Sequence, residues 1–341
     1  MGKFADLEVS FFDPEFTLAP YPYLEELYAR PDILGFRSEG MNFVFRFEEA
    51  RAVMYNNACA REPLANPEIA ERETRLAQQY PNRAKNFLLG YTHGEAPDLV
   101  MKKLLMNYIQ QIAGRADFTC TEAIFGKLSG GGRLDNYIEE ICTLPLRIML
   151  MTSGLPYTEQ QLLDLYWAGF DFIKALDNFV DESPLAAADN AVASVWGYLE
   201  AALENTTGDS PIARFMAEGE AAGISREKMI VNISSFLIIS LSNTAGVSSA
   251  YLLRNLINNP EARRKLQENP ALLCEDSVIM EFLRRDNHVK ALSRQAHDGF
   301  SLGDHDIEQG ESINIFFPGV NLDPTHWDNP LAIDLNRQFT G

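Results

Sequence analysis

Glu281 and Arg284 form the clearest charged constellation in the sequence. They stand three residues apart in Glu281-Phe282-Leu283-Arg284, a spacing that places both side chains on one face of a helix. A carboxylate and a guanidinium at this spacing normally form a surface ion pair, and the motif also occurs by chance. On its own the pair predicts an ionic contact and no reaction.

A second group of polar residues lies inside an apolar stretch and reads Ser240-Leu241-Ser242-Asn243-Thr244. The Thr244 hydroxyl could handle a proton, whereas the Asn243 amide cannot titrate. Buried polar groups require partners, so these side chains either bond back to helix carbonyls or ordered water, or they line a ligand site. Both interpretations stay open at the level of sequence.

No nucleophile or metal-ligand pattern is recognisable. The four cysteines form no CxxC pair, which argues against a zinc site or a disulfide framework and favours buried free thiols. None of the five histidines stands near a nucleophile elbow, and the acidic stretch 177–182 lacks the spacing of an aspartate-rich metal site. The cysteines are Cys59, Cys120, Cys142 and Cys274. We therefore expect neither a metal site nor serine or cysteine hydrolysis.

The charge balance excludes two classes of partner. Lys and Arg total 29 against 48 Asp and Glu, which gives a net charge of -19. A surface this acidic repels phosphate backbones and anionic lipid, so we expect binding neither to nucleic acid nor to a membrane. The first ten residues have no apolar signal core, and no later apolar run is expected to reach the 18 residues that spanning requires. These observations predict a cytoplasmic protein.

Helix signals dominate the elements that must position these residues. Asn259-Pro260-Glu261 predicts a helix start, and that helix should stop near Asn269-Pro270. The stretch from Met229 to Ile257 is apolar nearly all round and predicts the central helix of the fold. Strands are predicted at Phe43–Phe47, Gly299–Leu302 and Ser312–Phe317. No linker divides the chain, so we expect one mainly α domain with small β-sheets over residues 1–341.

Three late segments, in a fixed order, resemble bacterial cytochromes P450. Glu281 to Arg284 matches the family's ExxR, Ser293-Arg294-Gln295-Ala296 matches the segment that follows, and the stretch from Asn321 to Arg337 matches the turn-rich region beyond. Earlier segments are similar as well: 22–27 to the opening helix, 43–54 to the first strands and 239–245 to the central, oxygen-activating helix. The resemblance implies a P450-like fold in which Glu281, Arg284 and Arg337 form a buried structural ion network.

The resemblance also exposes departures at the positions that would hold haem. The family's cysteine ligand follows the segment that ends here near Arg337, so the resemblance implies a C-terminally truncated fold without that loop and without the last helix. The usual propionate-holding His and Arg are matched by Asp98 and Lys102, and Arg294 is a further propionate position if haem binds. Lys102 lacks the fork of an arginine and could equally be part of a solvated basic face.

The central helix departs in the same direction. The family has a small residue, Gly, any residue, an acid and Thr where this sequence has Ser240 to Thr244. Leu241 replaces the glycine that lets the backbone approach haem, and Asn243 replaces the acid that relays protons, so only Thr244 keeps the pattern. The resemblance implies a substrate pocket whose walls could equally be plain core, at Phe87, Leu88, Trp167, Phe170, Phe236, Ser240 and Leu241.

Two hypotheses for function follow. The first is a haem-free P450 homologue that needs no cofactor and acts as an accessory protein, similar to the haemless homologues that stabilise glycosyltransferases in natural-product pathways. It would bind a partner protein or a second copy through apolar surface left by the missing helix, and a small apolar ligand could also bind. The second is a haem-thiolate monooxygenase acting on a small apolar substrate, whose C-terminal haem-binding segment is absent from this chain or supplied by another.

Overall fold

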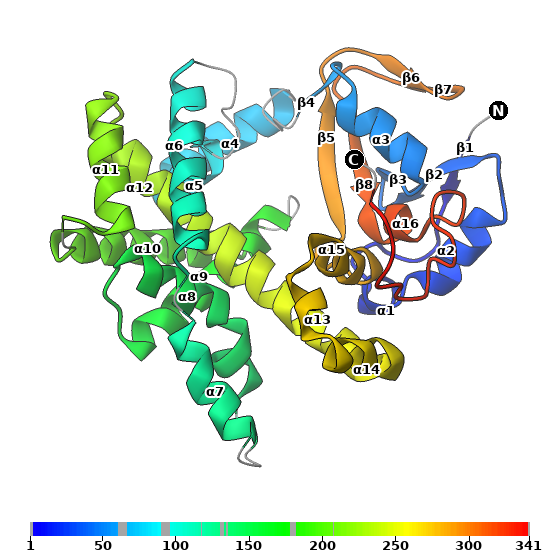
Figure 1. Ribbon diagram of the computed structural model, residues 1–341. Helices are drawn as coiled ribbons and strands as arrows, with labels where there is room; N and C mark the ends of the chain where they lie inside the picture. The colour runs from blue at the N-terminus through cyan, green and yellow to red at the C-terminus, as the bar shows by residue number, and fades with distance from the viewer. Residues whose placement is uncertain are drawn as a thin grey trace. The chain divides into compact units, whose positions relative to one another are not determined.

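The computed structural model describes residues 3–60, 67–89, 96–116, 118–129, 133, 136–177, 182–206 and 208–339. The chain divides into two compact units, one made of residues 1–71 with 251–341 and the other of residues 72–250. We call them the sheet unit and the helical unit and describe each by itself (Figure 1). The expectation of a single domain stays a prediction.

The sheet unit takes elements from both ends of the chain. Its strands are β1 (Lys3–Asp6), β2 (Ile33–Ser38), β3 (Met41–Val44), β4 (Cys59–Ala60), β5 (Ala291–Ala296), β6 (Phe300–Leu302), β7 (His305–Ile307) and β8 (Ser312–Phe316). Its helices are α1 (Pro14–Leu18), α2 (Tyr21–Tyr28), α3 (Phe47–Tyr55), α14 (Pro260–Glu268), the 3₁₀ turn Pro270–Cys274, α15 (Asp276–Arg285) and α16 (Phe317–Leu322).

The helical unit is built from long helices around one hydrophobic core. They are α5 (Pro81–Leu89), α6 (Ala96–Ala113), α7 (Thr119–Ser129), a π-helical turn (Ile138–Cys142), α8 (Leu144–Ser153), α9 (Glu159–Asp177), α10 (Leu185–Glu204), α11 (Pro211–Ala221), α12 (Arg226–Ser235) and the π-helical segment η3 (Phe236–Ala245). Two helices cross the boundary between the units, α4 (Pro67–Gln79) and α13 (Gly246–Asn258).

The main sheet joins residues from the two ends of the chain. Its strand order is β1-β2-β3-β8-β5-β4, so that β8, from the last part of the sequence, lies between β3 and β5 (Figure 1). The β3–β8 pair is parallel, with Phe43 opposite Asn314, and the β5–β8 pair is antiparallel, with Arg294 opposite Ile313. A pleated strand sends alternate side chains to opposite faces, so this register places the buried Ile313 and Ile315 on one face.

A buried arginine closes the end of α2. Arg46 donates hydrogen bonds to the carbonyl oxygens of Ile33 at 2.9 Å and Arg30 at 3.0 Å, and more weakly to those of Leu27 and Tyr28. The last carbonyls of a helix have no partner within the helix, so this side chain satisfies them. The contact fastens α2 to the first strands of the sheet.

The central helix departs from α-helical geometry where the polar residues occur. The sequence predicts one helix from Met229 to Ile257, and the structure has α12, then η3, then α13 over this range. The Ser242 hydroxyl donates to the carbonyl oxygen of Leu237, five residues back, at 2.8 Å, and also contacts that of Leu165 at 3.3 Å. A bond to the fifth residue back is the spacing of a π-helix, so the serine bonds within its own helix.

Most of the predicted elements are confirmed. The opening helix is α2, the helix predicted after Asn259 is α14, and the predicted strands correspond to β3, β6 and β8. One expectation is wrong: the strand predicted to Phe47 ends at Val44, and residues 47–55 form α3. The acids Glu48 and Glu49 occupy its first turn, where negative charge stabilises a helix, and the apolar run before them hid that start.

One helix of the described chain, Arg226–Asn258, is long and apolar enough to cross a membrane by length and composition alone. The expectation that no segment would reach this length is therefore wrong by that measure. Ile230, Ile233, Leu237 and Ile238 of this helix are buried in the core of the helical unit. A core helix of this kind passes the same test, so the finding is weak evidence for a membrane span.

Candidate functional site

The charged constellation of the sequence lies on α15. Asp276 stands in the first turn of this helix and Arg284 and Arg285 in its last turn, each where it complements the helix dipole. Val278 and Phe282, four residues apart, are buried on one face and pack in a small apolar cluster with Leu335. This packing holds the polar face of α15 against the segment 321–337.

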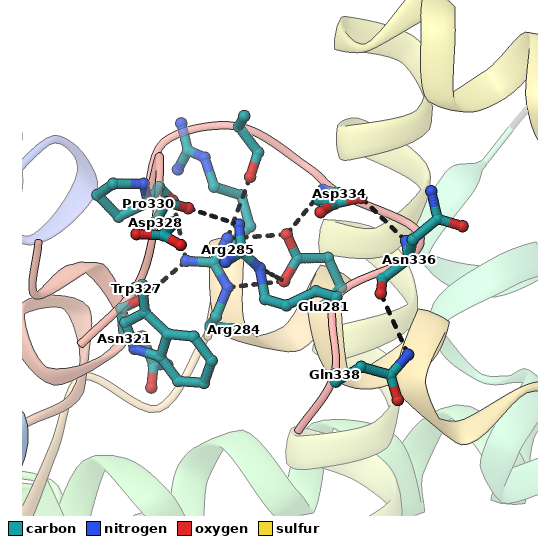
Figure 2. Close-up of polar contacts among 12 residues, drawn as sticks. Glu281, Arg284, Arg285, Asn321, Trp327, Asp328, Pro330, Asp334, Asn336 and Gln338 are labelled. Atoms are coloured by element: carbon teal, nitrogen blue, oxygen red, sulfur yellow. Dashed lines mark hydrogen bonds and ion pairs between the residues drawn. The ribbon is translucent and has the colours of Figure 1, made fainter. Parts of the chain in front are cut away.

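Glu281 is the centre of the network in Figure 2. Its carboxylate accepts two hydrogen bonds from Arg284, at 2.7 Å from Nε and 2.9 Å from Nη2, and one from Nε of Arg337 at 2.9 Å. The backbone N–H of Asp334 donates a fourth at 2.8 Å. Glu281 is fully buried and Arg284 is 4% exposed, so the predicted ion pair is not a surface contact.

The remaining donors of Arg284 go to backbone oxygens, and Arg337 makes one such bond. Arg284 donates to the carbonyls of Asn321 at 2.7 Å, Pro330 at 2.9 Å and Ala332 at 3.1 Å (Figure 2). Arg337 donates to that of Asp328 at 3.1 Å. One carboxylate therefore faces two guanidiniums, and carbonyl dipoles compensate the excess positive charge.

Trp327 completes the network from the turn-rich segment. The guanidinium carbons of Arg284 and Arg337 lie 5.4 and 5.7 Å from the centre of its ring, and its Nε1 donates to the Val320 carbonyl at 3.2 Å. Trp327 is not predictable from the sequence, because an aromatic residue among turn residues carries no signal for stacking on two arginines. These contacts fasten residues 321–337 to α15, so the network acts as a structural clamp on this segment.

The central-helix residues lie in the helical unit. Ser240, Leu241 and Thr244 are half-buried on η3, and Ser242 is fully buried and bonded to carbonyl oxygens. For Ser242 this favours back-bonding to the helix over a ligand contact. The side chain of Asn243 lies outside the described residues. The proton-handling position predicted at Thr244 stays a prediction.

The residues predicted as pocket walls come from three helices of the same unit. Phe170 on α9 and Phe236 and Leu241 on η3 pack against the main core, as plain core residues do. Trp167 is 46% exposed and lies 5.5 Å from Phe170 between ring centres. Phe87 and Leu88 lie on α5, with side chains outside the described residues. A role in ligand binding stays a prediction for all of these walls, Ser240 included.

The two predicted propionate positions belong to different units. Lys102 is exposed on α6 of the helical unit, in keeping with a solvated basic face. Arg294 is 5% exposed on β5 of the sheet unit, where its Nη1 donates to the carbonyl of Ser293 at 3.0 Å. A buried guanidinium fits an anion such as a propionate, whereas the side chain at Asp98 lies outside the described residues.

The four cysteines lie on different elements of the fold. Burial raises the pKa of the Cys142 thiol, which lies on a π-helical turn. Burial also raises the pKa of Cys59 on β4, although the charge of Arg294 opposes this effect. Cys120 lies on α7 and Cys274 is exposed on the 3₁₀ turn, and the absence of the family's cysteine ligand from residues 1–341 stays a prediction.

Comparisons with known proteins place these features in one family. The model of the cytochrome P450 family matches residues 201–337. Cytochrome P450 107B1 of Saccharopolyspora erythraea is 22% identical over 87% of this chain and 73% of its own length. The mycinamicin VIII C21 methyl hydroxylase of Micromonospora griseorubida is 22% identical over 60% of this chain and 54% of its own. The crystal structure of CalO2 superposes with a TM-score of 0.75 at 21% identity, over 97% of this chain and 83% of that one.

The family model, the curated relatives and the superposed structures support the cytochrome P450 superfamily, of the bacterial type, for this chain. The predicted mainly α fold with small sheets is confirmed, and it is the P450 fold. Members of the superfamily bind haem, and the expectation that this chain needs no cofactor has no support from these comparisons. The predicted loss of the cysteine loop and of the last helix stays a prediction.

Proposed function

We propose that this chain functions in haem-dependent monooxygenation of a small apolar substrate, with the iron's thiolate coming from residues outside 1–341. The observation that carries the proposal is the complete, buried Glu281–Arg284–Arg337 network in a chain of the P450 superfamily. The network clamps the segment after which the family places its cysteine loop. The hydroxylase among the relatives supports the same reaction class.

The proposal assigns a limited role to this chain's own residues. Arg294, a buried cation, would hold a haem propionate, and the Thr244 hydroxyl would hold a proton near the reacting oxygen. Haem itself would supply the oxygen-activating chemistry. Phe170, Phe236 and Leu241 would contribute apolar surface to the substrate site. The acidic surface disfavours binding to membranes and nucleic acid, so these roles fit a cytoplasmic enzyme.

A second function is favoured by specific residues, a haem-free accessory protein. Leu241 stands where the family has a glycine, Asn243 where it has an acid and Lys102 where it has an arginine. A chain that never binds haem is free to lose all three. In that case we propose that a partner protein or a second copy covers apolar surface on the central helix and its neighbours.

Reconstitution with haem separates the two functions. The chain is expressed both as residues 1–341 and as the full product of its own reading frame, loaded with haem, reduced and exposed to carbon monoxide. The monooxygenase proposal expects a thiolate-type Soret band from the full product only, and the same product with Thr244→Ala should keep that band while losing coupled turnover. A full product that takes up no haem contradicts it and favours the accessory function.

A sizing experiment tests the accessory function independently. Light scattering of the purified chain should show a dimer if a second copy covers the apolar surface. A haem-free monomer that shows no binding of a hydrophobic dye would contradict this interaction.

A further inference from the structure

A polar pocket of about 390 Å³ lies wholly within the sheet unit. Four stretches line it: the end of α1 at Leu18, the start of α2 at Tyr21, the end of α13 with the residue after it (Arg254 to Asn259), and the end of α15 with the residue after it (Arg285 and Asp286). Its volume is in the range of small-molecule sites, roughly 300–1,000 Å³. None of its lining residues belongs to the Glu281–Arg284–Arg337 ion pairs or to the positions considered for haem.

The charges that line the pocket are unbalanced. Arg254 forms an ion pair with Asp286. Arg285 donates to the Tyr21 hydroxyl at 2.6 Å and to the Leu331 carbonyl at 2.8 Å, but forms no ion pair with any carboxylate of the described chain. Two guanidiniums against one carboxylate leave one net positive charge, in a protein whose total charge is -19.

A further cation, the Lys290 ammonium, lies close to Arg254 but does not line the pocket. The Lys290 ammonium and the Arg254 guanidinium both lie over the ring of Tyr251, at 5.4 and 4.4 Å from its centre. Burial and the charge of Arg254 lower the pKa of Lys290 to about 8. Positive charges that crowd one another in this way favour an anion nearby, since an anion relieves their repulsion.

The pocket also contains a buried donor without an acceptor. Asn255 is 7% exposed, and its Nδ2 meets no hydrogen-bond partner within the described residues. Leaving a buried amide unpaired costs roughly 1–3 kcal/mol, and native proteins rarely accept that cost without a role for the group. The Tyr21 hydroxyl accepts a hydrogen bond from Arg285 and can still donate one of its own.

We propose that this pocket binds an oxyanion, the phosphate or carboxylate group of a small polar molecule. The fork of Arg285 offers charge-assisted hydrogen bonds to two oxygens, and the Asn255 amide and the Tyr21 hydroxyl supply further donors. Asp286 remains paired with Arg254 and closes that side of the pocket. Asn258, exposed at the pocket, lies where the rest of the ligand would leave it.

Calorimetric titration of the full chain with inorganic phosphate and, separately, with succinate tests the site. Sodium chloride keeps the ionic strength constant, so that general screening does not count as binding. Arg285→Gln should weaken binding at least about tenfold, the effect of one charge-assisted contact. Asn258→Asp should do the same by repulsion, and since Asn258 is exposed this variant should keep the fold.

Arg264→Gln is the matched control, because it also removes one positive charge but lies on α14, paired with Glu268 and outside the pocket. The site is supported if phosphate or succinate binds, if R285Q and N258D weaken that binding, and if R264Q changes it by less than twofold. The probe that binds identifies the class of oxyanion. Absence of binding by both probes overturns the proposal. Equal weakening by R264Q also overturns it, since the response would then be to net charge alone.

Discussion

The Glu281 carboxylate is the shared counter-ion of two arginines. We expect Glu281→Gln to destabilise the chain by roughly 3–5 kcal/mol, since it leaves Arg284 and Arg337 as buried cations without a counter-ion. Urea unfolding followed by circular dichroism measures the loss. Glu268→Gln, which breaks the exposed pair with Arg264, should change stability by no more than about 0.5 kcal/mol. Similar losses for both variants would contradict a buried network.

Lys290 should make stability depend on pH in the alkaline range. Its pKa is about 8 in the folded protein against 10.5 in the unfolded chain, so between these values the unfolded state binds more protons. The contribution of Lys290 to the free energy of unfolding should therefore rise as the pH increases from about 8 to 10.5, because the folded state no longer bears a buried cation. Buried tyrosines with raised pKa values, such as Tyr28 and Tyr108, lower the total free energy as the unfolded chain ionises near pH 10, so the Lys290 effect is read as a difference from a variant.

The test is urea unfolding of Lys290→Met across this pH range. The free energy of unfolding of the wild type minus that of the variant should rise over this interval, and the variant should be the more stable of the two below pH 8. Lys174→Met, at an exposed lysine on α9, should keep the wild-type dependence. A difference between the wild type and Lys290→Met that stays constant over this interval would rule out the assignment.

The sequence predicted the site only in part. The three-residue spacing of Glu281 and Arg284 was enough to predict an ion pair, and the family resemblance added Arg337. The contacts of the Asp334 N–H with the carboxylate and of the Trp327 ring with the guanidiniums were not predictable. They depend on the course of a loop, which the sequence does not show. The pocket at Arg285 was missed for the same reason, since its walls come from residues over 200 positions apart.

At the scale of the element, α9 and η3 approach each other closely at a glycine. A Cβ on Gly169 would lie 2.6 Å from the Ser242 Cβ and 2.7 Å from the Ile238 carbonyl oxygen. We therefore expect Gly169→Ala to destabilise the chain by roughly 1–3 kcal/mol through overpacking. Gly197 on α10 has open space around it, so Gly197→Ala should stabilise by about 0.5–1 kcal/mol through helix propensity. Guanidinium unfolding measures the change in stability of both variants. Changes of the same sign for the two would contradict the close contact at Gly169.

The strands show where sequence patterns fail. β8 was predicted because Ile313, Ile315 and Phe316 are apolar, and all three are buried in the structure. β5 was missed because its buried half includes Arg294 and Gln295, which a strand pattern does not place inside. The Gln295 side chain is paired with Ser312 across the sheet, and this partner is visible only once β8 lies beside β5. Tertiary pairing thus overrode local propensity.

For the whole molecule, the net charge of -19 implies self-repulsion in the folded state. We expect the melting temperature to rise when sodium chloride is increased from roughly 10 to 500 mM, because the Debye length falls from about 30 to below 5 Å. Differential scanning calorimetry at pH 7 measures this effect. A melting temperature that falls with salt would mean that favourable surface pairs outweigh the repulsion.

The order of the strands has a consequence for how the chain is made. Asn42 on β3 and its neighbour Asn314 on β8 are 272 positions apart, with the whole helical unit encoded between them. At about 5–20 residues per second, a ribosome takes some 15–50 seconds to deliver the second strand after the first. During that interval the edge of β3 is unpaired and open to other nascent chains, so this protein should depend on chaperones early in synthesis.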